Sequence, residues 1–202
     1  MIFVSNLENK SLIPDIAALH KKAFKGFFLT KLGVPFLKTL YTGFFEDDKS
    51  GILIAKDKDK LIGFLAYSKD YPRFFKQLIK KHIIGFAVCS AGAAIKHPSF
   101  IKRILGAFKK SDEVKKDDNY VELASICVDP DCESQGIGTA LIDELKSIIN
   151  FNKFAYISLE TDAENNDIVN KFYVKNGFAL KRTYKTGEGR LMNEYTYCPE
   201  EI

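Results

Sequence analysis

One run of the chain, residues 121–185, alternates strand and helix signals more regularly than the rest of the sequence. A nearly continuous apolar strand over 121–128 is followed by a turn that contains Gly136 and Gly138, and a helical pattern begins there. A second strand, a second helix and a Gly-Phe pair that ends at Phe178 then follow in that order. Because such elements bury their apolar sides against one another, this run restricts the chain to a mixed α/β fold.

Apolar spacing predicts further elements on both sides of this run. Strands are expected at 2–4, 52–56, 60–68, 154–159, 178–185 and 190–198, and helices at 12–24, from 34 onward, at 137–148 and from 166 or 167 to about 175. The segment 71–119 is rich in both apolar and basic residues and predicts two or three helices. We expect a single domain over residues 1–202, with 71–119 as a helical basic insertion before the central strand.

Size and composition limit the class of protein. A chain of 202 residues can bury one good core and is short for two ordinary domains. Its 46% hydrophobic and 28% charged residues are typical of a soluble globular protein, and no stretch approaches the ~20 apolar residues that cross a bilayer. The first residues lack a secretion signal. We therefore expect a cytoplasmic location and no stable membrane insertion.

The cysteines and histidines indicate neither a metal site nor a disulfide framework. The four cysteines share no CxxC spacing, and the three histidines stand apart. Cys127 lies in an apolar strand pattern and is interpreted as a core residue, whereas Cys132, beside the glycine turn, could be partly exposed and reactive. The net charge of +4 fits a polyanionic ligand without requiring one.

The glycine turn has the chemistry of a phosphate site. Gly136 and Gly138 lack a Cβ, so backbone amides can approach phosphate oxygens, and the helix that follows presents its positive dipole end. The dinucleotide fingerprint fails because Leu141 occupies its third glycine position, and the P-loop fails because no Gly-Lys-Ser/Thr follows. Two common nucleotide-binding classes are thereby excluded.

Two motifs carry a family resemblance. Residues 133–138 resemble Q/R-x-x-G-x-G/A, and residues 166–178 resemble N-x-x-A-x-x-x-Y-x-x-x-G-F, with Val169 in place of the small residue. In this order they are similar to the core of the Gcn5-related N-acetyltransferases (GNAT). The resemblance implies a GNAT-like α/β fold of the α+β kind, with a mixed, mostly antiparallel central sheet flanked by helices. It covers 121–185 strongly and 1–70 through element order alone.

The same resemblance implies a site for acetyl-CoA and no metal. Main-chain groups of the strand would pair with the pantetheine arm, the turn would bind the pyrophosphate, and the second helix would contact pantetheine and sulfur. The implied coenzyme-binding residues are Ile126, Cys127, Val128, Glu133, Ser134, Gln135, Gly136, Ile137, Gly138, Thr139, Asn166 and Tyr173. Glu133 departs from the usual Arg or Gln, which is tolerable if its backbone makes the contact.

The resemblance also suggests two catalytic residues. The resemblance makes Tyr173 the acid that protonates the leaving thiolate, and Glu122 the base that takes a proton from the attacking amine, directly or through a water. Attack on the thioester would be direct, with a strand amide such as that of Val128 holding the oxyanion. The alternatives are a strand-end Glu122 in solvent, a core Tyr173 and an Asn166 that only caps its helix.

The acceptor and the activity itself admit alternatives. A small-molecule amine is the expected acceptor. The aromatic and basic residues of 27–30 and 71–119 suit an anionic amino sugar linked to a nucleotide. If the basic residues only form a solvated face, the acceptor is an ordinary amine, peptide or protein. A non-catalytic acyl-CoA sensor is the alternative from another class. A third alternative is that the basic segment contacts a membrane surface or nucleic acid. The segment lacks the regular aromatic interleaving of a nucleic-acid reader, so no nucleic acid is expected. A homodimer is compatible with the sequence.

Overall fold

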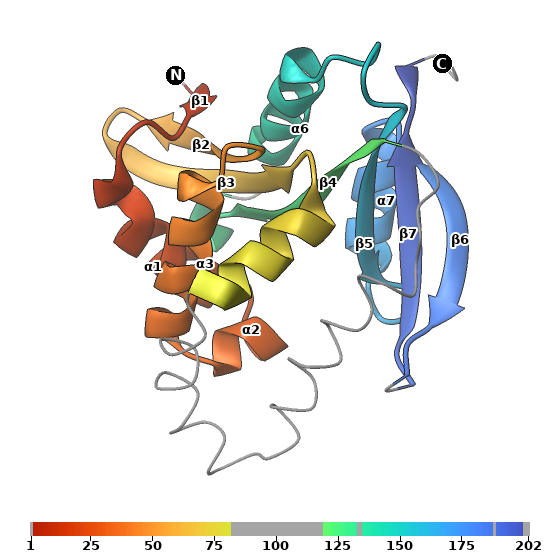
Figure 1. The fold of residues 1–202 in the computed structure, drawn as a ribbon, viewed down its shortest axis with the longest axis horizontal. Coiled ribbons are helices and arrows are strands. Elements are labelled where there is room, and N and C mark those ends of the chain that lie inside the picture. The colour runs from red at the N-terminus through yellow and green to blue at the C-terminus, as the bar shows by residue number, and fades with distance from the viewer. Residues whose placement is uncertain (1, 82–118, 133–134, 188, 200–202) are drawn as a thin grey trace.

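The computed structural model describes residues 2–81, 119–132, 135–187 and 189–199 (Figure 1). Its strands form one seven-stranded sheet in the order β1-β2-β3-β4-β5-β7-β6. The strands are β1 (Ile2–Asn6), β2 (Ser50–Asp57), β3 (Lys60–Ser68), β4 (Tyr120–Val128), β5 (Tyr156–Asp162), β6 (Ala179–Lys185) and β7 (Leu191–Tyr197). Only β4 and β5 pair in parallel, which confirms the mixed, mostly antiparallel sheet.

Helices lie on both faces of this sheet, as predicted. The α-helices are α1 (Ile13–Ala23), α2 (Phe28–Lys31), α3 (Val34–Glu46), α6 (Ile137–Ile148) and α7 (Asp167–Lys175), and short 3-10 turns lie at Lys10–Leu12 and Pro130–Cys132. Pro35 stands in the first turn of α3, where the missing N–H costs nothing. Within the described ranges, no helix combines the length and apolar character needed to cross a membrane.

The predicted basic insertion is described only at its two ends. A helix runs from residue 71 to at least 81, and Phe74 and Leu78 bury its apolar side, as their spacing predicts. The other helices expected in 71–119 fall on residues 82–118, outside the described residues.

The strand expected at 154–159 is shifted in the structure. Phe154 and Ala155 precede β5, which begins at Tyr156, and they donate their backbone N–H groups to the carbonyl oxygens of Asn150 and Asn119. The strand then continues to Asp162, because β7 pairs with it as far as Asp162 opposite Met192. The prediction was wrong at both ends because pairing with a distant strand, not local apolarity, sets the length of β5.

Two apolar layers pack on the two faces of the sheet. One layer, called the front layer here, contains α1, α3 and the helix 71–81, and its core includes Phe64, Leu37 and Phe74. The back layer contains α6 and α7, with Leu141 and Tyr173 in its core. Figure 1 shows α1, α3 and the helix 71–81 on the viewer's side, and α6 and α7 behind the strands. Alternate residues of one strand therefore face different helices.

A buried histidine lies in the front layer. His20 of α1 is 3% exposed, and its Nδ1 lies 2.6 Å from the Tyr41 hydroxyl of α3. Its Nε2 is buried and has no hydrogen-bond partner within the described residues. Burial therefore lowers the pKa of His20 to about 4.

This histidine is expected to destabilise the fold in acid. Between pH 6.5, its ordinary pKa, and pH 4, the unfolded chain binds a proton that folded His20 does not, so the unfolding free energy falls as pH falls. The loss approaches about 3 kcal/mol below the lower pKa. Urea unfolding of the protein and of His20→Gln at pH 7 and 4.5 measures it. Equal pH dependence in both proteins would contradict the expectation.

Candidate active site

The glycine turn begins helix α6 with a left-handed residue. Gly136 has φ +76° and ψ 4° and occupies the N-cap position of α6, a conformation that side chains with a Cβ rarely adopt. No side chain of the described residues caps this helix, and its first backbone bond joins the Ala140 amide to the Gly136 carbonyl at 2.9 Å. The amides of residues 137–139 therefore have no partner inside the helix. Glu133 and Ser134 lie outside the described residues.

The second glycine lets α6 approach α7. A Cβ added to Gly138 would lie 2.9 Å from Cζ and 3.1 Å from Cε2 of the Phe172 ring. Such contacts are closer than packed carbon atoms tolerate. Gly138 therefore lets the start of α6 pack directly against α7 at Phe172, the residue before Tyr173.

Charged side chains hold the segment that precedes the turn. Asp129 is 4% exposed, and its carboxylate accepts hydrogen bonds from the Lys22 ammonium and, at 3.0 Å, from the Asp131 amide. Lys60 Nζ lies 3.6 Å from the other oxygen. The Lys22 hydrogen bond lowers the pKa of Asp129, so the carboxylate remains charged and fixes the exit from β4.

Strands β4 and β5 part after three paired residues. Tyr120, Val121 and Glu122 pair with β5, but β4 continues to Val128 beside β3, while β5 continues to Asp162 beside β7. Beyond Glu122 the β4 edge that faces β5 has no pairing with it. Backbone groups of residues 126–128, the predicted pantetheine contacts, lie on this part of β4, where a ligand could pair with the edge as an added strand would.

Tyr173 lies on the back layer near the turn. It is 7% exposed, and its ring packs against Phe172, Phe178 and Tyr195 at centroid distances of 5.4, 6.0 and 5.9 Å. Burial raises the pKa of its hydroxyl, so the phenol stays protonated at neutral pH. Within the described part of the chain, no side chain or backbone group forms a hydrogen bond with this hydroxyl.

Asn166 occupies the N-cap position of α7 but does not cap it with its side chain. Its Nδ2 instead donates to Thr161 Oγ1 at 2.8 Å and to the Asp162 carbonyl at 3.0 Å, at the end of β5. The N-cap position of Asn166 is therefore confirmed, but its side chain bonds to β5 and does not cap the helix. Asn170, which the sequence did not single out, accepts hydrogen bonds from Asn193 and Tyr195 of β7 and donates to the Asp162 carbonyl.

Glu122 is a buried carboxylate at the point where the strands part. It is 8% exposed and lies between Ser68 of β3 and Ser158 of β5, both fully buried. The alternative of a strand-end carboxylate in solvent is therefore wrong. Its neighbours Val121 and Leu123 belong to the back layer, so Glu122 faces the opposite side of the sheet from Tyr173. The structure thus places one candidate catalytic residue on each face of the sheet, near the point where β4 and β5 separate.

Comparison with known proteins agrees with this arrangement. The model of the acetyltransferase (GNAT) family matches residues 13–178. The chain belongs to the GNAT family of acetyltransferases. No sequence among the curated proteins is similar enough to match it.

Solved structures of acetyltransferases share the GNAT fold of this chain. The ribosomal-protein-S18-alanine N-acetyltransferase of Escherichia coli is 17% identical, with TM-score 0.58 over 98% of this chain and 94% of that one. Arabidopsis thaliana NAA60, determined in complex with acetyl-CoA, is 15% identical, with TM-score 0.59 over 99% of each chain. A variant of the Vibrio cholerae spermidine N-acetyltransferase SpeG is 12% identical, with TM-score 0.58 over 98% and 93%. At such identities the likeness shows the fold alone.

Cys127 is unsuited to be a nucleophile in this GNAT protein. It is 5% exposed, in agreement with its interpretation as a core residue, and burial raises the pKa of its thiol to about 12. Only a thiolate attacks a thioester efficiently. Cys132 is half-buried beside the turn. No cluster of three metal-ligating side chains occurs in the part of the chain that the structure describes.

A bulge in β4 links the strand to the buried histidine. The register with β3 shifts between Ala66 and Tyr67, which leaves Ala124 as an extra residue. Ser125 then faces the front layer, and its Oγ lies 3.5 Å from the Tyr41 hydroxyl that contacts His20. No local sequence signal predicts this link, because the bulge, α1 and α3 are distant in the sequence and come together only in the folded protein.

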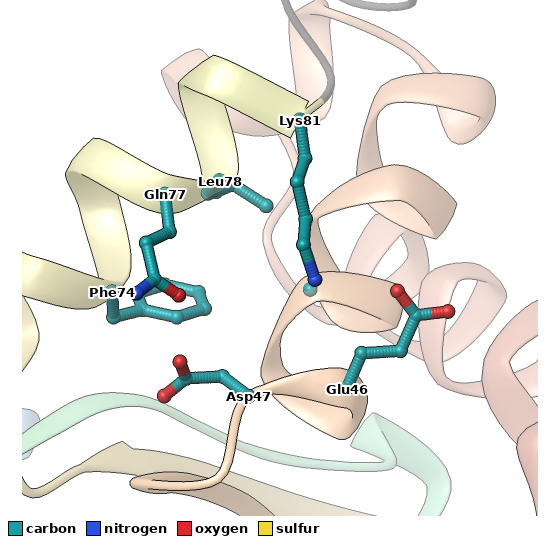
Figure 2. A pocket seen from close by; sticks show the side chains of 7 residues that line it. Glu46, Asp47, Phe74, Gln77, Leu78 and Lys81 are labelled. Atoms are coloured by element: carbon teal, nitrogen blue, oxygen red, sulfur yellow. The ribbon is translucent and has the colours of Figure 1, made fainter.

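A small cavity lies away from these residues. It measures about 20 Å³ and lies between the end of α3 and the helix 71–81 (Figure 2). Its lining comprises Gly43, Glu46, Asp47, Phe74, Gln77, Leu78 and Lys81, none of which is a predicted site residue. Figure 2 shows Lys81 reaching from its helix toward Glu46. This cavity has room for about one water molecule and is too small for a coenzyme.

Proposed function

We propose that the chain is an N-acetyltransferase that moves the acetyl group of acetyl-CoA to a primary amine by direct attack in a ternary complex. The parting of β4 from β5 after Glu122 supports this proposal most strongly. At this separation the unpaired edge of β4 could bind the thioester between the start of α6, in the back layer, and the Glu122 carboxylate, on the front face. The family of the chain supports the same reaction class.

The coenzyme would bind along the back layer and the free edge of β4. Its pyrophosphate would accept hydrogen bonds from the amides around Gly136, where the α6 dipole favours negative charge. Its pantetheine arm would pair with backbone groups of residues 126–128. Asn166 would contact the arm from the start of α7, through the oxygen of its amide, because its nitrogen is engaged by β5.

The chemical step needs three proton transfers, two from the acceptor nitrogen and one to the departing sulfur, and no covalent enzyme intermediate. Glu122 would take a proton from the acceptor ammonium, and the neutral nitrogen would attack the thioester carbon. As the carbon–sulfur bond of the tetrahedral intermediate breaks, Tyr173 would give its proton to the departing sulfur. The nitrogen, positively charged after the attack, would lose its second proton and thereby restore the Tyr173 hydroxyl, while Glu122 returns its own proton to solvent. A β4 amide would hold the oxyanion between these events. The buried, protonated thiol of Cys127 supports direct transfer.

Substituting Gly138 tests the proposed pyrophosphate site. In Gly138→Ala the new Cβ would meet the Phe172 ring at 2.9 Å, so either the start of α6 or that ring has to shift. We expect CoA affinity to fall about tenfold, or about 1.4 kcal/mol, because a shift of α6 would move the amides of residues 137–139 away from the pyrophosphate. Titration calorimetry with CoA measures the change. Gly187→Ala is the control, because nothing lies within 4 Å of a Cβ added there, and equal affinity of both variants would contradict the proposed site.

Thiol release separates the enzyme from the alternative sensor. A catalyst releases CoA thiol from acetyl-CoA in proportion to added amine, whereas a sensor binds the coenzyme and releases none. We expect heat on CoA addition and amine-dependent thiol release. An absence of CoA binding would refute the proposed site, and binding without release by any amine in a broad panel would favour the sensor.

A further inference from the structure

Tyrosines and carboxylates gather on the front face of β4 and β5. Val121, Leu123, Ile157 and Leu159 pack into the back layer, so the residues between and beside them point to the front. With two side chains from neighbouring segments, they form what we call the tyrosine–carboxylate face: Tyr71, Tyr120, Glu122, Tyr156, Glu160 and Tyr184. Glu122 and Glu160 each contribute to raising the pKa of Tyr71 and of Tyr120, after burial as the first cause. The two carboxylates therefore lie near both phenols.

Two cations of the chain itself already lie on rings of this face. Tyr120 and Tyr156 stack with an interplanar angle of 12° and a centroid distance of 5.8 Å. Lys181 Nζ lies 4.5 Å from the centroid of Tyr156 and 3.5 Å from its hydroxyl, and Arg182 Cζ lies 5.2 Å from the centroid of Tyr184. Ring faces attract ammonium and guanidinium groups within about 6 Å. The face thus has the electrostatics of a cation site, and Lys181 marks where an ammonium fits.

Glu160 adds an exposed carboxylate to this face, further along β5 than the residue that pairs with Glu122. Its Oε2 accepts a hydrogen bond from the Tyr184 hydroxyl at 2.5 Å. It stands two residues past Ser158, the partner of Glu122, on the part of β5 that β4 no longer covers. At the rise of a strand, two residues span roughly 7 Å, which is the reach of a short alkyl diamine. Glu194, in contrast, is 1% exposed and is balanced by Arg182 Nε at 2.6 Å.

We propose that the acceptor carries a second positive charge, and that the tyrosine–carboxylate face binds it. This inference rests on the proposed function: Glu122 would receive the reacting amine, while Glu160 would hold the second ammonium, which would displace Lys181 from the Tyr156 ring. Such an acceptor is a diamine, a polyamine or a basic side chain. A nucleotide-linked amino sugar would bring negative charge to these carboxylates and is disfavoured by like-charge repulsion.

Three ligands of equal length test the charge preference. Putrescine, n-butylamine and γ-aminobutyrate share one primary amine and differ only in a cationic, neutral or anionic end. Each is titrated by calorimetry into the free protein and into its CoA complex, where no acetyl group can transfer. Putrescine is expected to bind about tenfold more tightly than n-butylamine, from one cation–π contact and one partly exposed ion pair, with γ-aminobutyrate weakest.

The outcomes separate this inference from the proposed function. Equal affinities, a preference for γ-aminobutyrate, or no putrescine binding would overturn the cationic acceptor. The titrations of free protein decide that point even if CoA fails to bind, a failure that would count against the proposed function instead. Thiol release with n-butylamine alone would support the enzyme and reject the preference.

Variants locate the second charge on the face. Glu160→Gln is expected to reduce the preference for putrescine over n-butylamine about fivefold. Lys181→Met is expected to strengthen putrescine binding, because it removes an ammonium that competes with the ligand. Asp143→Asn is the matched control, because it removes one exposed carboxylate from α6, on the other side of the sheet. An unchanged preference in Glu160→Gln, or an equal loss in Asp143→Asn, would overturn the assignment. Melting curves of all variants check that the fold is intact.

Discussion

Replacing Tyr173 with Phe is expected to lower turnover by roughly 100-fold or more while CoA affinity changes by less than about twofold. The substitution keeps the ring that packs against Phe178 and Tyr195 and removes only the hydroxyl. Without it, the departing sulfur leaves as a thiolate, which is a poorer leaving group than the thiol. Single-turnover thiol release with saturating acetyl-CoA measures the chemical step, and calorimetry with CoA measures affinity.

The control for this experiment removes a phenol elsewhere in the back layer. Tyr197 packs against Phe151 and Phe178, with Lys146 over its ring, and is not a proposed site residue. Tyr197→Phe should retain turnover. If Tyr173→Phe turns over as fast as this control, Tyr173 is a core residue with no role as acid, and the coenzyme sulfur takes its proton from another donor.

Replacing Glu122 with Gln is expected to lower turnover at neutral pH by roughly 100-fold, because the acceptor amine then has no base to remove its proton. The amide has nearly the size of the carboxylate, so the buried position between Ser68 and Ser158 stays filled. The deficit should shrink as the pH approaches the pKa of about 10 of a free alkyl amine, where the acceptor deprotonates without help. Rates measured from pH 6 to 10 test both statements.

A carboxylate outside the site provides the comparison for Glu122. Glu164 is exposed in the connection between β5 and α7, and Glu164→Gln should leave rate and pH profile unchanged. A pH–rate profile of Glu122→Gln with the shape of the unsubstituted protein would remove the base role. A deficit that stays constant at every pH would indicate a structural role for the carboxylate instead.

Much of the α6 end of the site could be predicted from residues close together in the sequence. Gly136 adopts a left-handed conformation before α6, and glycine reaches this conformation without the steric penalty that a Cβ imposes. The spacing of Asn166 and Tyr173 placed both on one helix, and α7 does start beside Asn166. Such features depend on a few bonds along the backbone, so sequence patterns carry them.

Other features of the site depended on contacts between distant segments. The amide nitrogen of Asn166 bonds to the end of β5, a partner that no spacing in α7 indicates. Glu122 is buried because Ser68 and Ser158 flank it, and these residues lie on strands before and after the basic segment. The charge of the basic segment left an anionic acceptor open as one alternative beside an ordinary amine, whereas the described front face brings together carboxylates and tyrosines from β4, β5, β6 and the helix 71–81.

The sequence by itself determined the order of strands and helices, the turn at Gly136 and the resemblance that led to the family, because apolar period and glycine position act locally. Only the tertiary structure decided where β4 leaves β5, which face each carboxylate occupies and which rings lie beside it. Strand register is set by pairing across many residues, and one shift of register would exchange the two faces of a strand. Sequence patterns can therefore indicate the proposed coenzyme site, whereas the surroundings of the proposed acceptor depend on how the strands of the sheet pair.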